Sequence, residues 1–525
     1  MTQCYDILVI GGGINGAGIA RDAVGRGLKV ALVEQSDIGA ATSSASTKLI
    51  HGGLRYLESY EFRLVRESLN ERELLLNMAP HIIHPMEFVL PHQQTLRPRW
   101  MIRLGLFLYD HIGGRKKLPT SRSIKIDGTK YGNGLSASIK HGFVYSDCRV
   151  DDSRLTLLNA MDAANRSAVI MPRTRFIDAE YHGEYWTARC ENALTNELFT
   201  LQAKVIVNAA GPWAGTVSHT FQAKASLRLV KGSHIVVPKL YEGEHALLLQ
   251  NTDGRVVFTI PYQSDYTLIG TTDESFTGDA TTVAISDEET QYLCDAVNQY
   301  FAKTTTAENV VWTYAGVRPL WDDEAQNNNS KVTRDYHLEM LQTPGPLLNV
   351  FGGKITTYRC LAESVMARLE NVLSFDRHSW TSTECLPGGD VAVDEFNSFV
   401  ASVAERWPFL SASLVKRLAS TYGTRVDMIL GRAKSMAELG HDFGLGLTEA
   451  EVSYLQVYEW AMTVDDVIWR RTKLGLQRDK LDLMALEKLL HRNAKKRYAA
   501  LHLPGSSVRE SGILRTNSAF VPQVK

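Results

Sequence analysis

The sequence predicts an α/β fold that combines a Rossmann-like dinucleotide-binding domain, an inserted domain rich in antiparallel strands, and a C-terminal helical domain. Three observations support this prediction. A glycine-rich turn joins a buried strand to a helix within the first 16 residues. Several later segments have the composition and alternation of strands. Past residue 389, the composition shifts to Leu, Ala, Arg and Glu at helical spacing, after a Pro/Gly linker.

A complete βαβ unit opens the chain. The apolar run at residues 7–10 predicts a buried parallel strand, and residues 17–27 predict the helix that follows it. Residues 30–33 predict the second strand, which ends on Glu34. An acid at this position accepts a hydrogen bond from a ribose hydroxyl, so the unit predicts a bound dinucleotide.

The turn Gly11-Gly12-Gly13-Ile14-Asn15-Gly16 supplies the phosphate site of this unit. Gly11 allows the tight turn, Gly13 lets the backbone approach a pyrophosphate, and Gly16 lets the helix pack closely on the strand. The amides at the helix N-terminus attract the phosphates.

The same unit narrows the choice of dinucleotide. Glu34 disfavours the 2′-phosphate of NADP but does not separate NAD from FAD. The small, hydroxyl-rich stretch at residues 40–46 would let a large flat ring system lie against the backbone, although a flexible loop has the same composition.

Composition excludes several classes of protein. The net charge is -1, so no global basic field predicts binding to nucleic acid. The six cysteines are scattered without a Cys-x-x-Cys pair, which argues against a zinc or iron–sulfur site built from paired ligands and fits a reducing compartment. We expect no bound metal. No apolar stretch approaches the roughly 20 residues of a membrane span, and a core strand follows almost directly on Met1. We therefore expect a protein of the cytoplasm, or one bound peripherally at the cytoplasmic face of the inner membrane.

The segment from Arg97 to Lys117 has the most unusual composition in the chain. Trp100, Leu104, Phe107 and Leu108 fall at helical offsets on one side, and Arg115, Lys116 and Lys117 close the segment. A basic amphipathic helix of this kind can lie in an anionic membrane interface. A core helix with a solvated basic edge is the commoner origin of such a pattern.

Two later strands are expected to return to the first sheet near the cofactor. Residues 205–208 form an apolar run that ends in Ala209, Ala210 and Gly211. Residues 347–351 form another, which opens through Gly352 and Gly353 into a helix beginning near Thr356. The predicted boundaries are 1–80, 144–222 and 340–375 for the dinucleotide-binding domain, 81–143 and 223–339 for the substrate or cap domain, and 385–525 for the helical domain.

These motifs together resemble the FAD-dependent glycerol-3-phosphate dehydrogenases of the bacterial, respiratory type, in the amino-acid-oxidase-like group of flavoproteins. The resemblance rests on residues 10–18, 42–56, 208–213, 316–320 and 351–358, and it is most specific at residues 48–57. It continues into the helical domain, at the segment Trp469-Arg470-Arg471-Thr472.

The resemblance implies an activity as well as a fold. It implies that sn-glycerol 3-phosphate is oxidised to dihydroxyacetone phosphate, with hydride passing from C2 to N5 of FAD and electrons to a membrane quinone. A homodimer is one expected assembly. Carried over by motif, the residues expected to bind FAD are Gly11, Gly13, Ile14, Asn15, Gly16, Glu34, Thr42, Ser43, Ser44, Lys48, Gly211, Gly353, Lys354, Ile355 and Thr356.

A phosphomonoester requires cations, preferably planar guanidinium groups that bind two oxygens at once. We expect Arg318 and Arg334 to bind the phosphate and Arg55 to lie near the substrate oxygens, with Tyr56 as a neutral donor. Each arginine could instead form a surface ion pair.

The base that takes the hydroxyl proton should be a histidine. We expect His234, with His51 as the reserve, although a histidine on an apolar strand is often a core residue. Lys354 would lie near N1 and O2 of the flavin and stabilise the reduced ring, unless it only begins a helix.

Three other functions stay open on the sequence alone. They are a glycerol-3-phosphate oxidase that uses O₂, an NAD-linked dehydrogenase, and a flavin-binding assembly protein without turnover.

Overall fold

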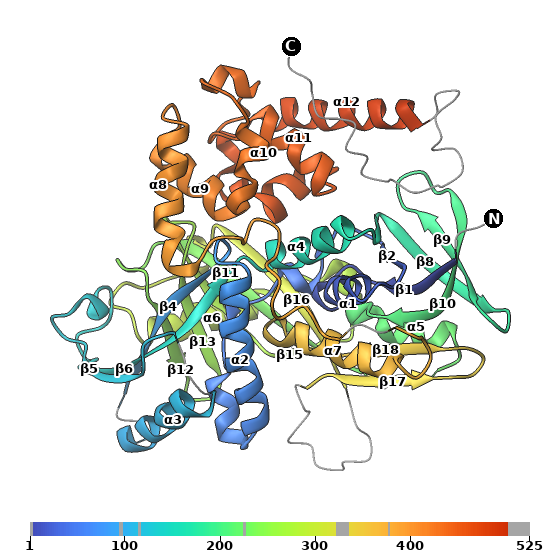
Figure 1. Ribbon diagram of the computed structural model, residues 1–525. Helices are drawn as coiled ribbons and strands as arrows, with labels where there is room; N and C mark the ends of the chain where they lie inside the picture. The colour runs from blue at the N-terminus through green and yellow to red at the C-terminus, as the bar shows by residue number, and fades with distance from the viewer. Residues whose placement is uncertain are drawn as a thin grey trace.

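The computed structural model describes residues 4–93, 98–113, 117–223, 227–321, 335–375 and 378–501. Among these residues, the strands form one eight-stranded and one ten-stranded sheet. Figure 1 shows the C-terminal helices stacked above the two sheets, with α3 at the opposite end of the molecule. No helix in the described part of the chain has both the length and the apolar character needed to cross a bilayer.

The first sheet has the strand order β17-β18-β10-β1-β2-β7, with β9 paired to β10 and β8 to β9. Strand β1 pairs in parallel with β2 and β10, and β10 pairs in parallel with β18. Because these strands are parallel, their carboxyl ends meet at one edge, which is where open α/β sheets bind ligands. The strands are β1 (Cys4–Ile10), β2 (Val30–Glu34), β7 (Val169–Pro172), β8 (Thr174–Tyr181), β9 (Trp186–Asn192), β10 (Leu198–Asn208), β17 (His337–Leu341) and β18 (Leu347–Phe351).

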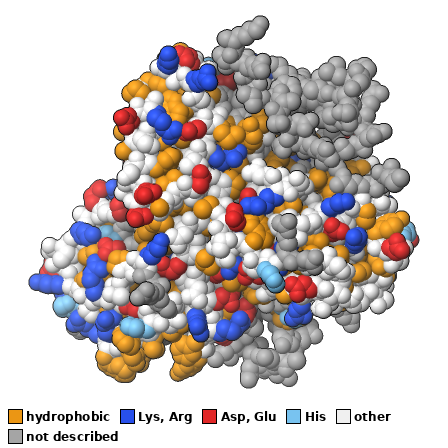
Figure 2. Space-filling view, in the orientation of Figure 1, with side chains coloured by type: hydrophobic (Ala, Val, Ile, Leu, Met, Phe, Trp, Pro, Cys, Tyr) orange, Lys and Arg blue, Asp and Glu red, His pale blue; other side chains and the backbone are white. Residues whose placement is uncertain are grey.

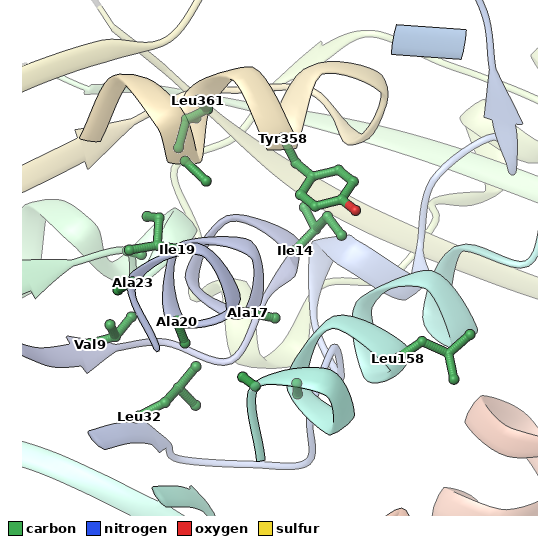
Figure 3. Close-up of a cluster of buried hydrophobic side chains, with 14 of the residues drawn as sticks. Val9, Ile14, Ala17, Ile19, Ala20, Ala23, Leu32, Leu158, Tyr358 and Leu361 are labelled. Atoms are coloured by element: carbon green, nitrogen blue, oxygen red, sulfur yellow. The ribbon is translucent and has the colours of Figure 1, made fainter. Parts of the chain in front are cut away.

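Helix α1 (Ile14–Gly25) is buried between this sheet and two other helices. Figure 3 shows its apolar side chains surrounded by Tyr358 and Leu361 of α7 (Tyr358–Leu369), by Leu158 of α4 (Asp152–Asn165), and by residues of β1 and β2. The small residues Gly18, Ala17, Ala20 and Ala23 let the neighbouring elements approach closely. This packing fixes the helix N-terminus at the carboxyl edge of the sheet.

The second sheet has the order β15-β11-β14-β13-β12-β4-β6-β3, with β16 beside β11 and β5 beside β6. Its pairs are antiparallel except β12 with β4, in keeping with the predicted inserted domain. The strands are β3 (Leu49–Ile50), β4 (Ile83–His92), β5 (Arg122–Lys125), β6 (His141–Val150), β11 (Leu227–Pro238), β12 (Ala246–Gln250), β13 (Val256–Tyr262), β14 (Tyr266–Gly270), β15 (Glu274–Ser275) and β16 (Trp312–Trp321). The helices around it are α2 (Phe62–Met78), α3 (Arg99–Ile112) and α6 (Asp287–Asn298).

The two sheets follow the predicted segments with three differences. Strands β3 and β6 belong to the second sheet, although β3 and most of β6 lie in segments predicted for the dinucleotide-binding domain. Strand β17 of the first sheet begins at His337, before the predicted start of its segment at residue 340. Strand β6 pairs continuously with β4 from Val150 to His141, so it has no break at residue 144 where the prediction placed one. The domain boundaries themselves stay a prediction.

The C-terminal helices have a separate apolar core, which includes Leu418, Tyr422, Leu455 and Leu486. They are α8 (Phe396–Arg406), α9 (Ala412–Tyr422), α10 (Val426–Leu430), α11 (Glu449–Tyr458) and α12 (Leu483–Leu501), with a π-helical turn at Asp466–Arg471. The short helix α5 (Ala214–Thr220) follows β10. The predicted helical domain is confirmed for the described residues, which end at 501.

Candidate active site

The glycine turn between β1 and α1 leaves room for a phosphate. Gly11 has a φ of +107°, and a Cβ there would lie 2.5 Å from the Ala209 carbonyl oxygen. A Cβ on Gly16 would lie 1.9 Å from the Gly11 carbonyl oxygen, so a side chain at either position would clash with the backbone of this tight turn. The Ile14 amide donates to the Ser43 hydroxyl at 2.9 Å, which fixes the first turn of the helix. The arrangement fits a pyrophosphate at the helix N-terminus.

Glu34 lies at the end of β2, at the edge of the same turn. Its two carboxylate oxygens each accept a backbone hydrogen bond at 2.7 Å, one from Gly12 and one from Ser36. Burial raises the pKa of Glu34 above its ordinary value, against the effect of these two amides. Each carboxylate oxygen has a second lone pair. The carboxylate can therefore still accept a bond from a ribose hydroxyl.

A cavity of about 610 Å³ runs along this edge of the first sheet. Its volume lies within the range of cofactor sites. The loop at its side is held against β16, because the Thr42 hydroxyl donates to the Val317 carbonyl at 2.7 Å. The cavity is lined by part of the predicted FAD-binding set, namely Gly11, Gly13, Glu34, Thr42, Ser43, Ser44, Lys48 and Gly211.

Lys48 is buried with a φ of 59° and holds the loop in shape. Its ammonium group donates to Asp152 Oδ1 at 2.8 Å and to the Ser44 carbonyl at 2.9 Å. Asp152 also accepts from the Ser46 hydroxyl at 2.7 Å. The charge of Lys48 is thus balanced within the protein, so its contribution to the cavity is mainly to position the loop.

Strands β11 and β16 bring His234 and Arg318 to one face of the second sheet. His234 lies opposite Tyr314, and the two rings stack with their centroids 4.7 Å apart. The Nε2 atom of His234 lies 3.0 Å from the Thr47 hydroxyl. Burial, assisted by the charges of Arg318 and Lys48, holds the pKa of His234 well below its ordinary value. The imidazole is therefore neutral near pH 7, as a general base must be.

Arg318 lies on β16, four residues after Tyr314, so its side chain is on the same face of the second sheet as Tyr314. Its guanidinium lies 3.4 Å from the Thr271 hydroxyl and 3.5 Å from Asp273 Oδ1. These contacts are long, and a third of the side chain is exposed. The partly exposed guanidinium thus lies at this face beside Thr271 and Asp273.

Lys354 lies in the turn between β18 and α7. Its ammonium nitrogen is buried and has no hydrogen-bond partner among the described residues. It lies 3.9 Å from the centroid of the Tyr56 ring. A buried cation without a hydrogen bond is costly, so the site fits an anionic ligand group. A Cβ added at Gly352 would lie 3.6 Å from the carbonyl oxygen of Pro319, the residue after Arg318, so this turn lies close to the backbone of β16.

The remaining predicted residues fall into three groups. The Asn15 side chain donates to the Gly352 carbonyl at 3.0 Å and lies beside Gly353, and Ile355 begins the short helix after Lys354. Thr356 accepts from the His51 amide at 3.4 Å, and the His51 ring accepts from the Gly53 amide. His51 therefore supports the turn, and His234 stays the predicted base. Arg55 is exposed on the 3₁₀ helix Leu54–Ser59, and Arg334 lies outside the described residues.

Some residues at the cavity were not predicted. Tyr314 and Trp312 line it from β16, and the period-2 alternation with Arg318 could have indicated both. Trp469, Arg470 and Lys473 line it from the C-terminal domain, and no local pattern indicates that a helical segment so far along the chain returns to the first sheet.

Comparison with known proteins covers nearly the whole chain. Residues 6–359 match the family described as FAD dependent oxidoreductase. Residues 379–496 match the family described as the C-terminal domain of alpha-glycerophosphate oxidase.

Two curated relatives are equally similar to the chain. A glycerol-3-phosphate dehydrogenase of Pseudomonas aeruginosa is 50% identical over 481 residues, which cover 91% of this chain and 93% of the relative. A D-erythritol 1-phosphate dehydrogenase of Brucella abortus is 50% identical over 475 residues, which cover 90% and 94%. The solved structure of the glycerol-3-phosphate dehydrogenase from Bacillus halodurans, complexed with FAD, matches with a TM-score of 0.74 at 28% identity and covers 95% of this chain and 91% of that chain.

Proposed function

Because this chain belongs to the family of FAD-dependent oxidoreductases, we propose that it oxidises sn-glycerol 3-phosphate to dihydroxyacetone phosphate, with a membrane quinone as the final electron acceptor. The observation that carries the proposal is the buried ammonium of Lys354, which has no hydrogen-bond partner among the described residues. Its turn lies against β16, the strand that carries Arg318 and pairs with the His234 strand β11. Two cations and a neutral imidazole are the groups that an anionic alcohol substrate needs.

The glycine turn, Glu34 and the loop around Ser43 would hold the dinucleotide, and Lys354 would lie at its redox-active end. When bound, FAD supplies the acceptor for the hydride that leaves C2 of the substrate. The residues of the chain bind and orient the alcohol for this hydride transfer and accept its hydroxyl proton.

Arg318 binds the phosphate, and His234 accepts the hydroxyl proton at its imidazole. The low pKa of His234 makes the free ring a weak base, because burial, together with the charges of Arg318 and Lys48, disfavours its charged form. A phosphate dianion bound to Arg318 offsets those charges and raises the basicity of the ring. Substrate binding thus prepares His234 to accept the proton. In this proposal Arg334 completes the phosphate site, and Arg55 lies near the substrate oxygens.

Replacing Arg318 by Ala should raise KM about 10- to 100-fold, since a hydrogen bond to a charged group contributes about 1.5–3 kcal/mol. FAD content should not change, and Arg318→Lys should recover part of the loss. Steady-state kinetics together with flavin absorbance test this. Arg122→Ala, which removes an arginine paired with Glu87 elsewhere on the same sheet, is the control. Wild-type KM in Arg318→Ala would remove Arg318 from the phosphate site.

Helix α3 supports a peripheral position at an anionic membrane. One of its faces packs through Ile102, Leu106 and Tyr109 against buried apolar side chains of the second sheet. The opposite face exposes Trp100 and Phe107, at 66% and 48%, together with Met101, Leu104 and Leu108. Figure 2 shows hydrophobic side chains at this end of the molecule with basic side chains around them. A core helix with a solvated basic edge would expose mainly polar side chains, whereas α3 exposes a face of large apolar side chains. Of the basic residues of the segment, Arg97, Arg115 and Lys116 lie outside the described residues.

The double variant Trp100→Ser, Phe107→Ser should lose most of its binding to vesicles that contain anionic lipid, because two aromatic side chains no longer enter the interface. Co-sedimentation measures the loss. The matched control is Leu194→Ser, Leu198→Ser, which removes two equally exposed apolar side chains from the hairpin of β9 and β10. Equal sedimentation of the two double variants would contradict the membrane role of α3.

A second substrate has specific support. The relative named for D-erythritol 1-phosphate is as similar to the chain as the one named for glycerol 3-phosphate. Both compounds are phosphorylated polyols with a secondary alcohol, and the cations and base described above suit either. The ratio of kcat/KM for the two compounds decides between them, and a preference for D-erythritol 1-phosphate would replace the substrate proposed here.

The choice of electron acceptor is tested separately from the substrate. Enzyme reduced by substrate in the absence of oxygen is mixed either with a soluble quinone or with air. Rapid reoxidation by quinone supports the proposal. Rapid reoxidation by air with one peroxide per flavin would instead identify an oxidase, and bound FAD that no polyol phosphate reduces would identify a flavin-binding protein without turnover.

A further inference from the structure

The C-terminal domain forms part of the wall of the cofactor cavity. Although the cavity lies at the edge of the first sheet, four of its lining residues come from the segment 465–473, more than 400 residues along the chain from the glycine turn. These residues are Asp465, Trp469, Arg470 and Lys473. Figure 1 shows the helices around this segment stacked over α4 and the first sheet.

Buried ion pairs fix this segment to the loop after β2, and the end of α11 just before it to α4. Arg471 pairs with Asp37, and Arg154 of α4 pairs with Glu459 through both carboxylate oxygens. Both partners of each pair are almost fully buried. Removing one partner of such a pair leaves an uncompensated buried charge, so the segment cannot easily separate from the sheet.

The π-helical turn of the segment is fixed by a second set of arginines. Burial alone would raise the pKa of Asp466, but Arg471, Arg470 and Arg173 hold it well below its ordinary value. Arg173 precedes β8 and donates to Asp466 Oδ1 at 2.8 Å. Asp466 is thus charged at all working pH values, and the turn is held on the sheet that binds the dinucleotide.

The turn presents an aromatic surface and a cation to the cavity. The ring of Trp469 stacks on Trp312 of β16, with centroids 4.5 Å apart and planes within 10° of parallel. Both indoles line the cavity, so the two domains meet in its wall. Arg470 lines it as well and pairs with Asp37, three residues after Glu34. The wall from the C-terminal domain therefore extends from the Glu34 end of the cavity to the aromatic end on β16.

We propose that the C-terminal domain is a structural part of the FAD site, in which Trp469 and Arg470 close the cavity over the bound dinucleotide and slow its release. Trp469 supplies a flat apolar surface. Arg470, whose guanidinium pairs with Asp37 and Asp466, closes the ribose and phosphate end with its planar group and its remaining N–H donors. The proposal does not depend on which polyol phosphate is oxidised or which acceptor is used.

The test compares FAD release from the holoenzyme of three variants. Trp469→Leu and Arg470→Gln should each release FAD about tenfold faster than the wild type, since interface substitutions act mostly on dissociation. The matched control is Arg406→Gln, which removes an arginine that pairs with Asp427 on the exposed surface of the same domain. It should release FAD at the wild-type rate. The increase in flavin fluorescence after dilution measures the rate.

A thermal measurement separates a cofactor contact from a general loss of stability. Weaker FAD binding makes Tm rise with added FAD over a range where the wild type is already saturated. A purely structural role lowers Tm by the same amount at every FAD concentration and leaves the release rate unchanged, and that result would overturn the proposal. Should Trp469→Leu fail to fold, Arg470→Gln alone decides by the same two readouts.

Discussion

Replacing Lys354 by Met should lower kcat/KM for sn-glycerol 3-phosphate by about 10²- to 10³-fold, the effect of removing one preorganised charge from an active site. The reason is that the ammonium is buried over the Tyr56 ring with no hydrogen-bond partner in the described part of the chain. It is therefore positioned for a charge that the ligands bring. Single-turnover reduction of bound FAD, followed by absorbance in a stopped-flow instrument, measures the effect directly.

The same variant should not be less stable. Loss of a buried ammonium that has no hydrogen bond to the described residues removes a desolvation cost, so Tm at saturating FAD should stay within a few degrees of the wild type. Lys140→Met removes an exposed lysine paired with Asp127 and should change neither quantity. A large fall in Tm with unchanged reduction kinetics would show that Lys354 supports the fold and not the reaction.

Replacing His234 by Asn should lower kcat by about 10²- to 10⁴-fold, the usual contribution of a positioned general base. FAD should remain bound, because His234 contacts Thr47 and Tyr314 and does not line the cavity. Stopped-flow reduction of the variant tests the expected loss. Reduction at the wild-type rate would show that another group accepts the hydroxyl proton of the substrate, and His51 would be the next candidate for the base.

The pH dependence gives a second test of His234. Its pKa in the free enzyme lies well below the ordinary value, so the ring stays neutral and able to accept a proton as the pH falls from 8 to 6.5. The second-order rate of FAD reduction at low substrate concentration, which reports the free enzyme, should therefore not fall in that range through this group, and should fall only at lower pH. Half-loss of activity near pH 6.5 that disappears in His234→Asn would mean that burial and the charges of Arg318 and Lys48 do not depress the pKa in the free enzyme.

Local patterns predict the first sheet well, because its strands and turns are specified by nearby residues. The glycine turn, the strand that ends at Glu34 and the later apolar strands all have short-range signals, and each is found where it was expected. The alternation along residues 312–318 also carries information on which side chains share a face, although only Arg318 was selected from it.

Long-range pairing explains what the sequence could not predict. Strand β6 joins the second sheet because it pairs along its full length with β4, and nothing within β6 itself distinguishes the two sheets. The approach of Trp469 to Trp312 depends on buried ion pairs between segments more than 300 residues apart. Patterns within short stretches of sequence cannot predict contacts between segments so far apart in the chain.

The central claim is that this cavity holds FAD beside a site for sn-glycerol 3-phosphate. An anaerobic titration of the purified protein tests it most directly, with the flavin absorbance followed as sn-glycerol 3-phosphate is added. We expect one equivalent to bleach the flavin in the wild type, and Lys354→Met to bleach far more slowly at the same FAD content. Protein that cannot be loaded with FAD, or bound flavin that sn-glycerol 3-phosphate leaves oxidised, would contradict the claim.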